Sequence, residues 1–213
     1  MDGTTPGQYF EADPTVESRR RVIHLTLPDV SMDLTTDSGV FSGDRVDAGT
    51  KLLLLEAPLP PATGHLLDLG CGYGPIAVTL AHRSPEATVW AVDVNERAVA
   101  LCAENARTRG QTNVRAIVGD NPEAATAHGL SPDVRFAAIY SNPPIRIGKP
   151  ALHQLLIGWL ALLAPDGVAH LVVHKHLGSD SLARWLIEAG WPTTRLTSRA
   201  GYRILTIDRP VEP

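Results

Sequence analysis

The stretch DLGCGYGP, residues 68–75, decides the fold, because it places a glycine-rich turn between an apolar run and a run with helical character. The apolar run HLLDLG, residues 65–70, has the length of a buried strand. Pro75 suits the first turn of a helix that continues through IAVTLAHR. A glycine turn that leads from a strand into a helix indicates an α/β protein with a ligand at the turn.

Strands and helices alternate downstream of this turn. We expect strands at 88–94, 113–119, 134–141 and 167–174, and helices at 96–109, 151–164 and 179–190. This alternation predicts a parallel sheet that is covered by helices on both faces. The segment 193–210 reads as a closing hairpin that turns near Gly201, so its two strands must be antiparallel.

The segment before the turn predicts a separate hairpin. Alternating, β-branched residues indicate strands at 21–27 and 30–36, and a helix is expected at 44–57 before a proline cluster. We expect residues 1–20 to be poorly ordered and residues 21–213 to form a single domain. The predicted fold class is α/β: a Rossmann-like, doubly wound, mostly parallel seven-stranded sheet with an antiparallel C-terminal hairpin, plus an N-terminal β-hairpin.

Composition limits the class of protein. The chain has 213 residues, of which 44% are hydrophobic, so it can bury the core of one domain. It has no run of about 18 apolar residues, and its N-terminus lacks the pattern of a secretory signal. Cys71 and Cys102 fit no spacing motif, which favours a cytoplasmic location. The net charge of −4 is uneven: residues 141–213 hold eight bases against five acids, so charge neither requires nor excludes a nucleic-acid partner.

The turn is suited to an adenosine-containing cofactor. Gly70, Gly72 and Gly74 end the first strand of the sheet, where glycine lets a ligand approach the backbone. Asp93 ends the next strand, 21 residues after Gly72, where its carboxylate can accept hydrogen bonds from two ribose hydroxyls. Gly72-x-Gly74-x-x-Ala77 also satisfies the relaxed dinucleotide fingerprint, so the turn alone leaves NAD open.

A second motif, SNPPIRIG at 141–148, ends the fourth strand of the sheet. With it, the chain resembles the class I S-adenosylmethionine-dependent methyltransferases that modify nitrogen. The resemblance is closer to the small-domain rRNA guanine-N2 methyltransferases of the 16S and 23S type, since it includes GVFSGDRVDAGTKLLL at 39–54 and AGYRIL at 200–205. It implies that residues 21–213 form a single class I methyltransferase domain, with S-adenosylmethionine as the cofactor and a ribosomal RNA or ribosomal subunit as the partner. The cofactor residues that it implies are Asp68, Gly70, Cys71, Gly72, Gly74, Asp93, Asp120 and Asn142.

The chemistry of amine methylation explains the motif. An aromatic exocyclic amine is a weak nucleophile, because its lone pair is delocalised into the ring. The side-chain oxygen of Asn142 and the carbonyl of Pro143 can accept its two hydrogens, and Pro144 helps to keep this backbone rigid. Asn142, Pro143 and Pro144 are therefore the predicted catalytic residues, and the reaction requires neither a metal nor a covalent nucleophile.

The substrate side of the motif departs from the family. Ile145 stands where relatives usually place Phe or Tyr, so apolar packing replaces a ring that could stack on the base. Arg146 and Lys149 follow, and we predict that they bind substrate together with Ile145; His153 is a further candidate.

Further expectations concern residues outside the two motifs. The resemblance places Asp120 beside the adenine amine, and Phe41, Asp47 and Thr50 in a segment that closes over the cofactor; helix capping explains Asp47 equally well. A metal site at His170, His174 and His176 is not expected, because histidines at a strand end are more often structural.

The leading hypothesis is an S-adenosylmethionine-dependent methyltransferase that acts on N2 of a guanine in ribosomal RNA. Three alternatives stay open: methylation of a protein glutamine, methylation of a small-molecule amine, and a non-catalytic RNA-binding module that keeps the fold. No membrane partner is expected, and the sequence does not specify an oligomeric state.

Overall fold

The computed structural model describes residues 16–210, which form two sheets and the helices around them. The smaller sheet consists of β1 (Arg21–Thr26) and β2 (Ser31–Thr36). The larger sheet consists of β3 (His65–Leu69), β4 (Thr88–Asp93), β5 (Val114–Val118), β6 (Phe136–Ser141), β7 (Leu163–His174), β8 (Thr193–Arg199) and β9 (Tyr202–Asp208). The helices are α1 (Ala48–Glu56), α2 (Pro75–Arg83), α3 (Glu96–Thr108), α4 (Pro122–Ala127), α5 (Lys149–Leu160) and α6 (Ser179–Glu188), with 3₁₀ turns η2 (Ile145–Ile147) and η3 (Lys175–Leu177).

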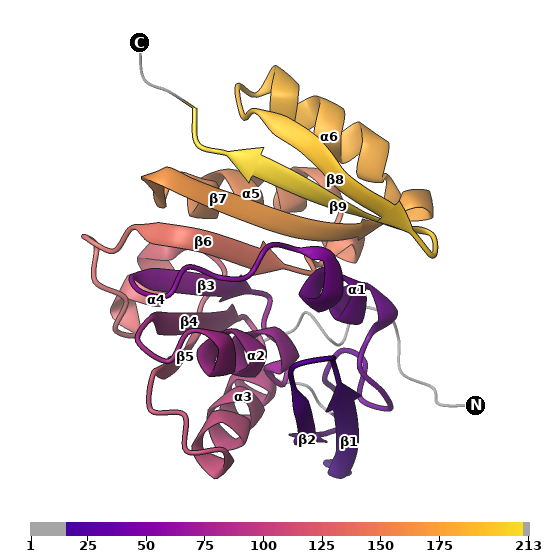
Figure 1. Cartoon of the computed structure of the whole chain (residues 1–213), viewed down its shortest axis with the longest axis vertical. Coiled ribbons are helices and arrows are strands. Elements are labelled where there is room, and N and C mark those ends of the chain that lie inside the picture. Colours follow the sequence, from indigo (N-terminus) through magenta and orange to yellow (C-terminus); the bar gives the residue numbers. More distant parts are fainter. Residues whose placement is uncertain (1–15, 211–213) are drawn as a thin grey trace.

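The larger sheet is seven-stranded with the order β5-β4-β3-β6-β7-β9-β8. Strands β3 to β7 run parallel to one another, whereas β9 runs antiparallel to both β7 and β8. Figure 1 shows β4 and β5 at one end of the sheet and the C-terminal strands at the other. The predicted fold class is confirmed. The strand order reverses between β3 and β6, and in such sheets that border is where ligands bind.

The helices cover both faces of the sheet. One apolar cluster joins the alternate sheet residues of one face to α1, α2, α3 and the N-terminal hairpin, and a second joins the other face to α4, α5 and α6. Neighbouring residues of one strand divide between the clusters, as Leu66 and Leu67 of β3 do. Both leucines are fully buried, as expected for a strand covered on two sides.

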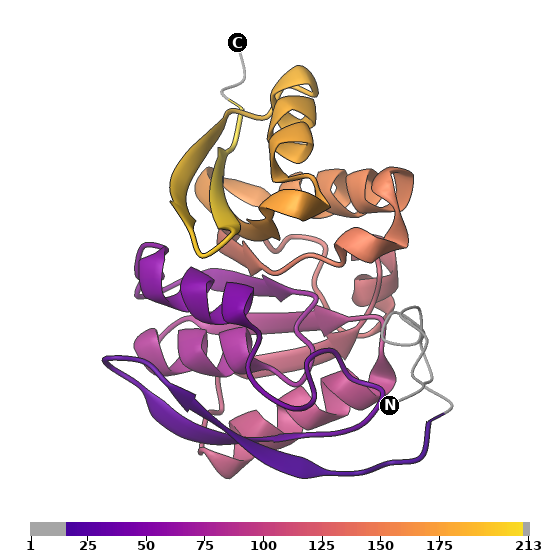
Figure 2. The same ribbon diagram turned by 90° about the vertical axis from the view of Figure 1, so that its right-hand side faces the viewer.

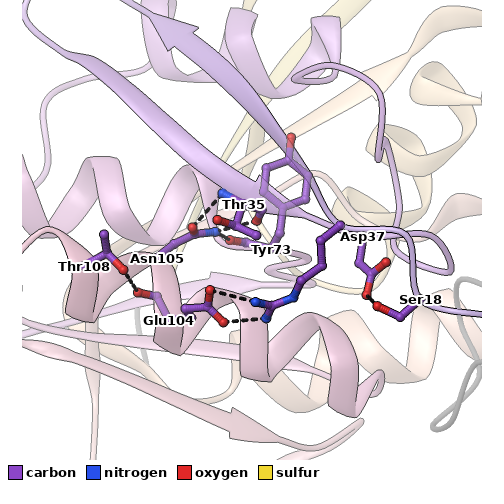
Figure 3. Close-up of polar contacts among 8 residues, drawn as sticks. Ser18, Thr35, Asp37, Tyr73, Glu104, Asn105 and Thr108 are labelled. Carbon is purple, nitrogen blue, oxygen red and sulfur yellow. Dashed lines mark hydrogen bonds and ion pairs between the residues drawn. The ribbon is translucent and has the colours of Figure 1, made fainter.

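The N-terminal hairpin lies along α3, at the end of the molecule away from α6 (Figures 1 and 2). Its main anchor is Asn105 of α3, which accepts the backbone N–H of Thr35 at 2.8 Å and donates to the carbonyls of Thr35 and Tyr73, both at 2.8 Å (Figure 3). Arg20 adds a two-pronged ion pair with Glu104. Because Tyr73 belongs to the glycine turn, one asparagine ties the hairpin to the predicted cofactor site.

Several element boundaries differ from the sequence expectation. The helix expected at 151–164 ends at Leu160, because Leu163 already pairs with Phe136 as the first residue of β7. Helix α4 was not expected, although Asn121 caps it and Pro122 starts it. The helix expected from residue 44 begins at Ala48, after Asp47 caps it.

Of the segment predicted to be poorly ordered, residues 1–15 lie outside the described residues. Residues 16–20 of this segment are described, and they contact Asp37, which follows β2: Ser18 Oγ and the backbone N–H of Arg19 both donate to the Asp37 carboxylate, at 2.6 and 2.5 Å. In the described part of the chain, no helix is long and apolar enough to span a membrane.

Candidate active site

The glycine turn after β3 uses its three glycines in different ways. All three have positive φ values, 76° at Gly70, 54° at Gly72 and 92° at Gly74, which favour glycine. A Cβ on Gly74 would lie 2.6 Å from the Sγ of Cys102, so this glycine lets α2 and α3 pack closely. A Cβ on Gly72 would meet nothing within 4 Å. Gly72 is therefore the position at which a ligand can approach the backbone.

Asp93, at the end of β4, faces this turn. Its Oδ2 accepts the backbone N–H of Gly72 at 2.9 Å, and its Oδ1 accepts that of Asn95 at 3.0 Å. Burial raises the pKa of this carboxyl, and the backbone N–H groups of Asn95 and Gly72 act in the opposite direction. Asp93 thus holds the turn in shape and also lines the cleft described below.

Asp68 is fully buried beneath the turn. Its Oδ2 accepts the backbone N–H of Ala77 in the first turn of α2, at 2.8 Å, whereas its Oδ1 has no hydrogen-bond partner. Burial raises the pKa of Asp68 to about 8, with the charge of Asp93 adding to the effect. Asp68 supports the turn from below rather than lining the cleft.

Asn142 follows β6 and lies beside the glycine turn, because β3 and β6 are paired through Leu69 and Ser141. Its side-chain nitrogen donates to Asp47 Oδ1 at 2.8 Å and to Thr50 Oγ1 at 3.0 Å. A carboxylate only accepts hydrogen bonds, so the atom next to Asp47 must be the amide nitrogen. The carbonyl oxygen of Asn142 is the group left for a ligand in the cleft.

The two prolines shape the next residues into a tight turn. Pro144 has φ −75° and ψ 71°, the conformation of an inverse γ-turn, and the carbonyl of Pro143 accepts the N–H of Ile145 at 2.8 Å. A carbonyl oxygen has two lone pairs, so this bond leaves one of them for a second donor. Asn142 and Pro143 thus offer two acceptor oxygens from adjacent residues.

A cleft of about 310 Å³ lies at the carboxyl ends of β3 to β6. Of the predicted site residues, Gly70, Gly72, Asp93, Asp120, Asn142 and Pro144 line it. Asp68, Cys71, Gly74, Pro143, Ile145, Arg146 and Lys149 do not. The structure therefore brings the glycine turn, the ribose candidate and the asparagine motif to one place.

The predicted substrate residues follow Pro144, a residue of the cleft wall, but do not line the cleft themselves. Ile145 is half-buried and packs with the α5–α6 cluster, whereas Ile147, two residues later, lines the cleft. Arg146 and Lys149 are exposed beside it. The ring of His153 is stacked on Trp185 of α6, with centroids 3.5 Å apart and an interplanar angle of 8°. His153 therefore joins two helices.

Phe41, on the loop before α1, is 44% exposed and lines the cleft. It supplies the aromatic surface that Ile145 does not.

The remaining cysteine and histidine candidates lie in the core or pack against other rings. Cys71 is buried and belongs to the core cluster under the hairpin. His170 is buried against Tyr140, and burial lowers its pKa to about 4. His174 packs edge-on against Tyr202, with ring centroids 4.8 Å apart. Within residues 16–210, no three His, Cys, Asp or Glu side chains are grouped so that they could hold a metal ion.

Sequence reasoning missed part of the cleft wall. The added residues include Asn95, Asn121, Ile147, Ala151, Gln154 and Leu155. The last four recur at helical spacing from η2 into α5, and this periodicity directly after the proline motif was an available signal. Asn95 and Asn121 were recognisable as helix caps, but their exposure to a ligand depends on how β4 and β5 are arranged.

Comparison with known proteins gives a consistent result. The family model of the methyltransferase small domain matches residues 31–206. The uncharacterized protein YbxB of Bacillus subtilis (strain 168) is 36% identical over 200 residues, covering 92% of this chain and 96% of that protein. The ribosomal RNA small subunit methyltransferase C of Shewanella halifaxensis is 35% identical over 164 residues, covering 75% of this chain and 45% of that protein.

A solved structure extends this comparison. It is a 16S rRNA N2 methyltransferase of T. thermophilus in complex with AdoMet and guanosine, with a TM-score of 0.75 and 25% identity. The match covers 92% of this chain and 52% of that one. The chain thus spans about half the length of the named rRNA methyltransferases that it matches.

Proposed function

The chain belongs to the methyltransferase small-domain family, whose cofactor is S-adenosylmethionine, and from this premise we propose that it methylates N2 of a guanine in ribosomal RNA. The proposal rests chiefly on Asn142, whose carbonyl oxygen is left for a ligand in the cleft that the glycine turn also lines, with the carbonyl of the adjacent Pro143 as a second acceptor. The rRNA methyltransferases among the relatives support ribosomal RNA as the class of substrate.

The residues of the cleft fit the cofactor. The open space at Gly72 admits the backbone approach that its amino-acid moiety needs, and Asp93 and Asp120 line the cleft where the ribose and the adenine would lie. When bound, S-adenosylmethionine supplies a methyl group on a cationic sulfur. Asn142 lies at the β3–β6 border, next to the glycine turn, so its acceptor oxygen would lie near the bound cofactor.

The acceptor pair matches the chemistry of an exocyclic amine. Guanine N2 carries two hydrogens, and Asn142 Oδ1 and the free lone pair of Pro143 can each accept one. Two such bonds fix the amine and direct its lone pair toward the methyl carbon, so catalysis consists mainly of positioning. Methyl transfer would convert the cofactor to S-adenosylhomocysteine, and the extra proton on the methylated nitrogen would leave to water.

The surroundings of the cleft are compatible with an RNA base. The target base has to leave its stack to reach the cleft, and Phe41 offers it an exposed aromatic surface there. Arg146 and Lys149 are exposed beside the cleft and can contact the flanking phosphates. We propose that Ile145 packs η2 against the second apolar cluster instead of contacting the base.

The test uses labelled S-adenosylmethionine with small and large ribosomal subunits, and with their naked RNA, from a strain that lacks the gene. Nucleosides are separated after digestion, and Asn142→Ala is assayed in parallel with its cofactor affinity measured by calorimetry. We expect label in N2-methylguanosine that is lost in Asn142→Ala, while the cofactor Kd stays within about twofold of wild type. Label in protein, or in no RNA, would refute the rRNA proposal.

A further inference from the structure

The N-terminus of α1 contacts the side chain of Asn142, although the two are distant in sequence. Asp47 caps the helix by accepting the N–H of Thr50 at 3.0 Å, and the same Oδ1 accepts a hydrogen of the Asn142 amide at 2.8 Å. Thr50 Oγ1 accepts the other at 3.0 Å. Both N–H groups of this amide are therefore occupied by α1, while the cleft side of Asn142 keeps only an acceptor.

The packing of α1 brings these groups into reach. A Cβ on Gly49 would lie 2.7 Å from Cε1 and 2.9 Å from Cδ1 of Tyr202 in β9, and 3.0 Å from Oδ1 of Asp47. Tyr202 is in turn held edge-on by His174. Glycine at position 49 thus allows the helix start to lie flat on Tyr202, with its capping residue facing Asn142. This contact relates two sequence motifs, DAGT at 47–50 and AGYRIL at 200–205, to the same site.

We propose that Asp47 and Thr50 are positioning residues that lock the Asn142 amide with its carbonyl oxygen toward the methyl acceptor. The inference rests on the proposed function, because it assumes that this oxygen receives a hydrogen of the target amine. An amide free to rotate by 180° about its last torsion would present N–H groups to an amine that itself donates. A carboxylate on the nitrogen side also polarises the amide and makes its oxygen a better acceptor.

The first experiment needs no methyl acceptor. Exchange of the two Asn142 side-chain protons with water is measured by NMR in the protein with S-adenosylmethionine, and the signals are assigned by their loss in Asn142→Ala. We expect exchange to become faster by on the order of tenfold in Asp47→Ala and in Thr50→Val, since each removes a hydrogen-bond partner. The same rate in Asp47→Ala as in wild type would overturn the proposal.

Two variants serve as controls for this measurement. Asp44→Asn removes a carboxylate from the same loop that pairs with Arg21 instead, so exchange at Asn142 should not change. Thr50→Ser keeps the hydroxyl and should restore the slow exchange that Thr50→Val loses. Faster exchange in Asp44→Asn, to the same extent as in Asp47→Ala, would assign the effect to the loop in general and overturn the lock.

The second experiment measures turnover in a double-mutant cycle. Asp47→Ala should lower kcat about 10- to 100-fold, with the cofactor Kd and the KM for RNA within about twofold of wild type. In the Asn142→Ala background, the same change should lower kcat by less than about twofold, because Asp47 acts through Asn142. A full additional loss in that background would show a general structural role and refute the proposal.

An exchange of the two side chains sharpens the cycle. Asn142→Asp alone sets two carboxylates at a contact that is now 2.8 Å long and should reduce kcat. Adding Asp47→Asn restores a donor opposite an acceptor, so kcat should rise about tenfold or more above that of Asn142→Asp alone. No recovery in the exchanged pair would count against the lock. If ribosomal RNA accepts no methyl group, the proposed function fails, but the proton-exchange experiment still decides whether the amide is locked.

Discussion

Replacing Gly72 by alanine should mainly weaken ligand binding, whereas replacing Gly74 by alanine should mainly lower protein stability. Both have positive φ, so alanine costs each about 1–2 kcal/mol of unfolding free energy. At Gly72 nothing else is added, because no atom lies within 4 Å of the new Cβ. At Gly74 the Cβ would lie 2.6 Å from Sγ, 3.1 Å from Cβ and 3.2 Å from Cα of Cys102. Cys102 is fully buried, so overpacking adds about 1–3 kcal/mol.

These free energies convert into measurable shifts. In a chain of this size, a loss of 1 kcal/mol of unfolding free energy lowers Tm by about 2–4 °C. The decrease in Tm should therefore be about twice as large in Gly74→Ala as in Gly72→Ala. Affinity for S-adenosylmethionine should instead decrease more in Gly72→Ala than in Gly74→Ala. A methyl group at Gly72 occupies the open cleft, and we expect the Kd for S-adenosylmethionine to rise about tenfold or more. Thermal unfolding and calorimetry on the two purified variants measure both quantities.

Adding Cys102→Ala to Gly74→Ala tests the cause of the instability. It removes the Sγ contact and leaves the two backbone-proximal contacts, so it should recover part of the lost Tm. Equal Tm losses in the two glycine variants would refute the packing argument. A wild-type Kd in Gly72→Ala would show that the turn does not approach the cofactor as described.

Three further predictions follow from the site. Asp93→Ala should raise the cofactor Kd about tenfold or more in calorimetry, since it removes the acceptor of the Gly72 N–H and the ribose candidate; an unchanged Kd would exclude Asp93 from the site. The pKa of Asp68 is raised to about 8 in the folded protein, whereas it is about 4 in the unfolded chain. Between pH 4 and pH 8, the folded protein therefore holds a proton on Asp68 that unfolding releases. Its contribution to the unfolding free energy therefore falls by about 1.4 kcal/mol per pH unit from pH 4 to pH 8, and Asp68→Asn should flatten that slope in chemical denaturation. Arg146→Ala with Lys149→Ala should weaken RNA binding and reduce the slope of log affinity against log salt by about 2 in filter binding, whereas an unchanged slope would remove both from the phosphate contacts.

The fold was predictable because its signals are local. The glycine turn, the proline at the start of α2 and the alternation of strands and helices each act over a few residues. The end of α5 was not, because the apolar run continues past Leu160 and only the pairing of Leu163 with Phe136 separates strand from helix. Helix α4 was within reach, since an asparagine cap followed by a proline is a start signal.

The site was predictable only as far as its motifs. The glycine turn and the asparagine–proline motif could be expected at one sheet edge, because parallel strands end there together. The partners of the Asn142 amide could not, because Asp47 and Thr50 lie 95 and 92 residues away and reach it through the packing of Gly49 on Tyr202. The sequence motif also did not indicate that Ile147, rather than Ile145, lines the cleft.

The docking of the hairpin through Asn105 has a consequence for synthesis on the ribosome. Thr35 precedes Asn105 by 70 residues, an interval of about 4 to 14 seconds at the usual rates of translation. An isolated two-stranded hairpin is marginally stable in water, so residues 21–36 wait for α3 before they can settle. When Asn105 arrives, it fastens the hairpin and the carbonyl of Tyr73 together. The hairpin and the glycine turn are thus joined only after α3 has been synthesised.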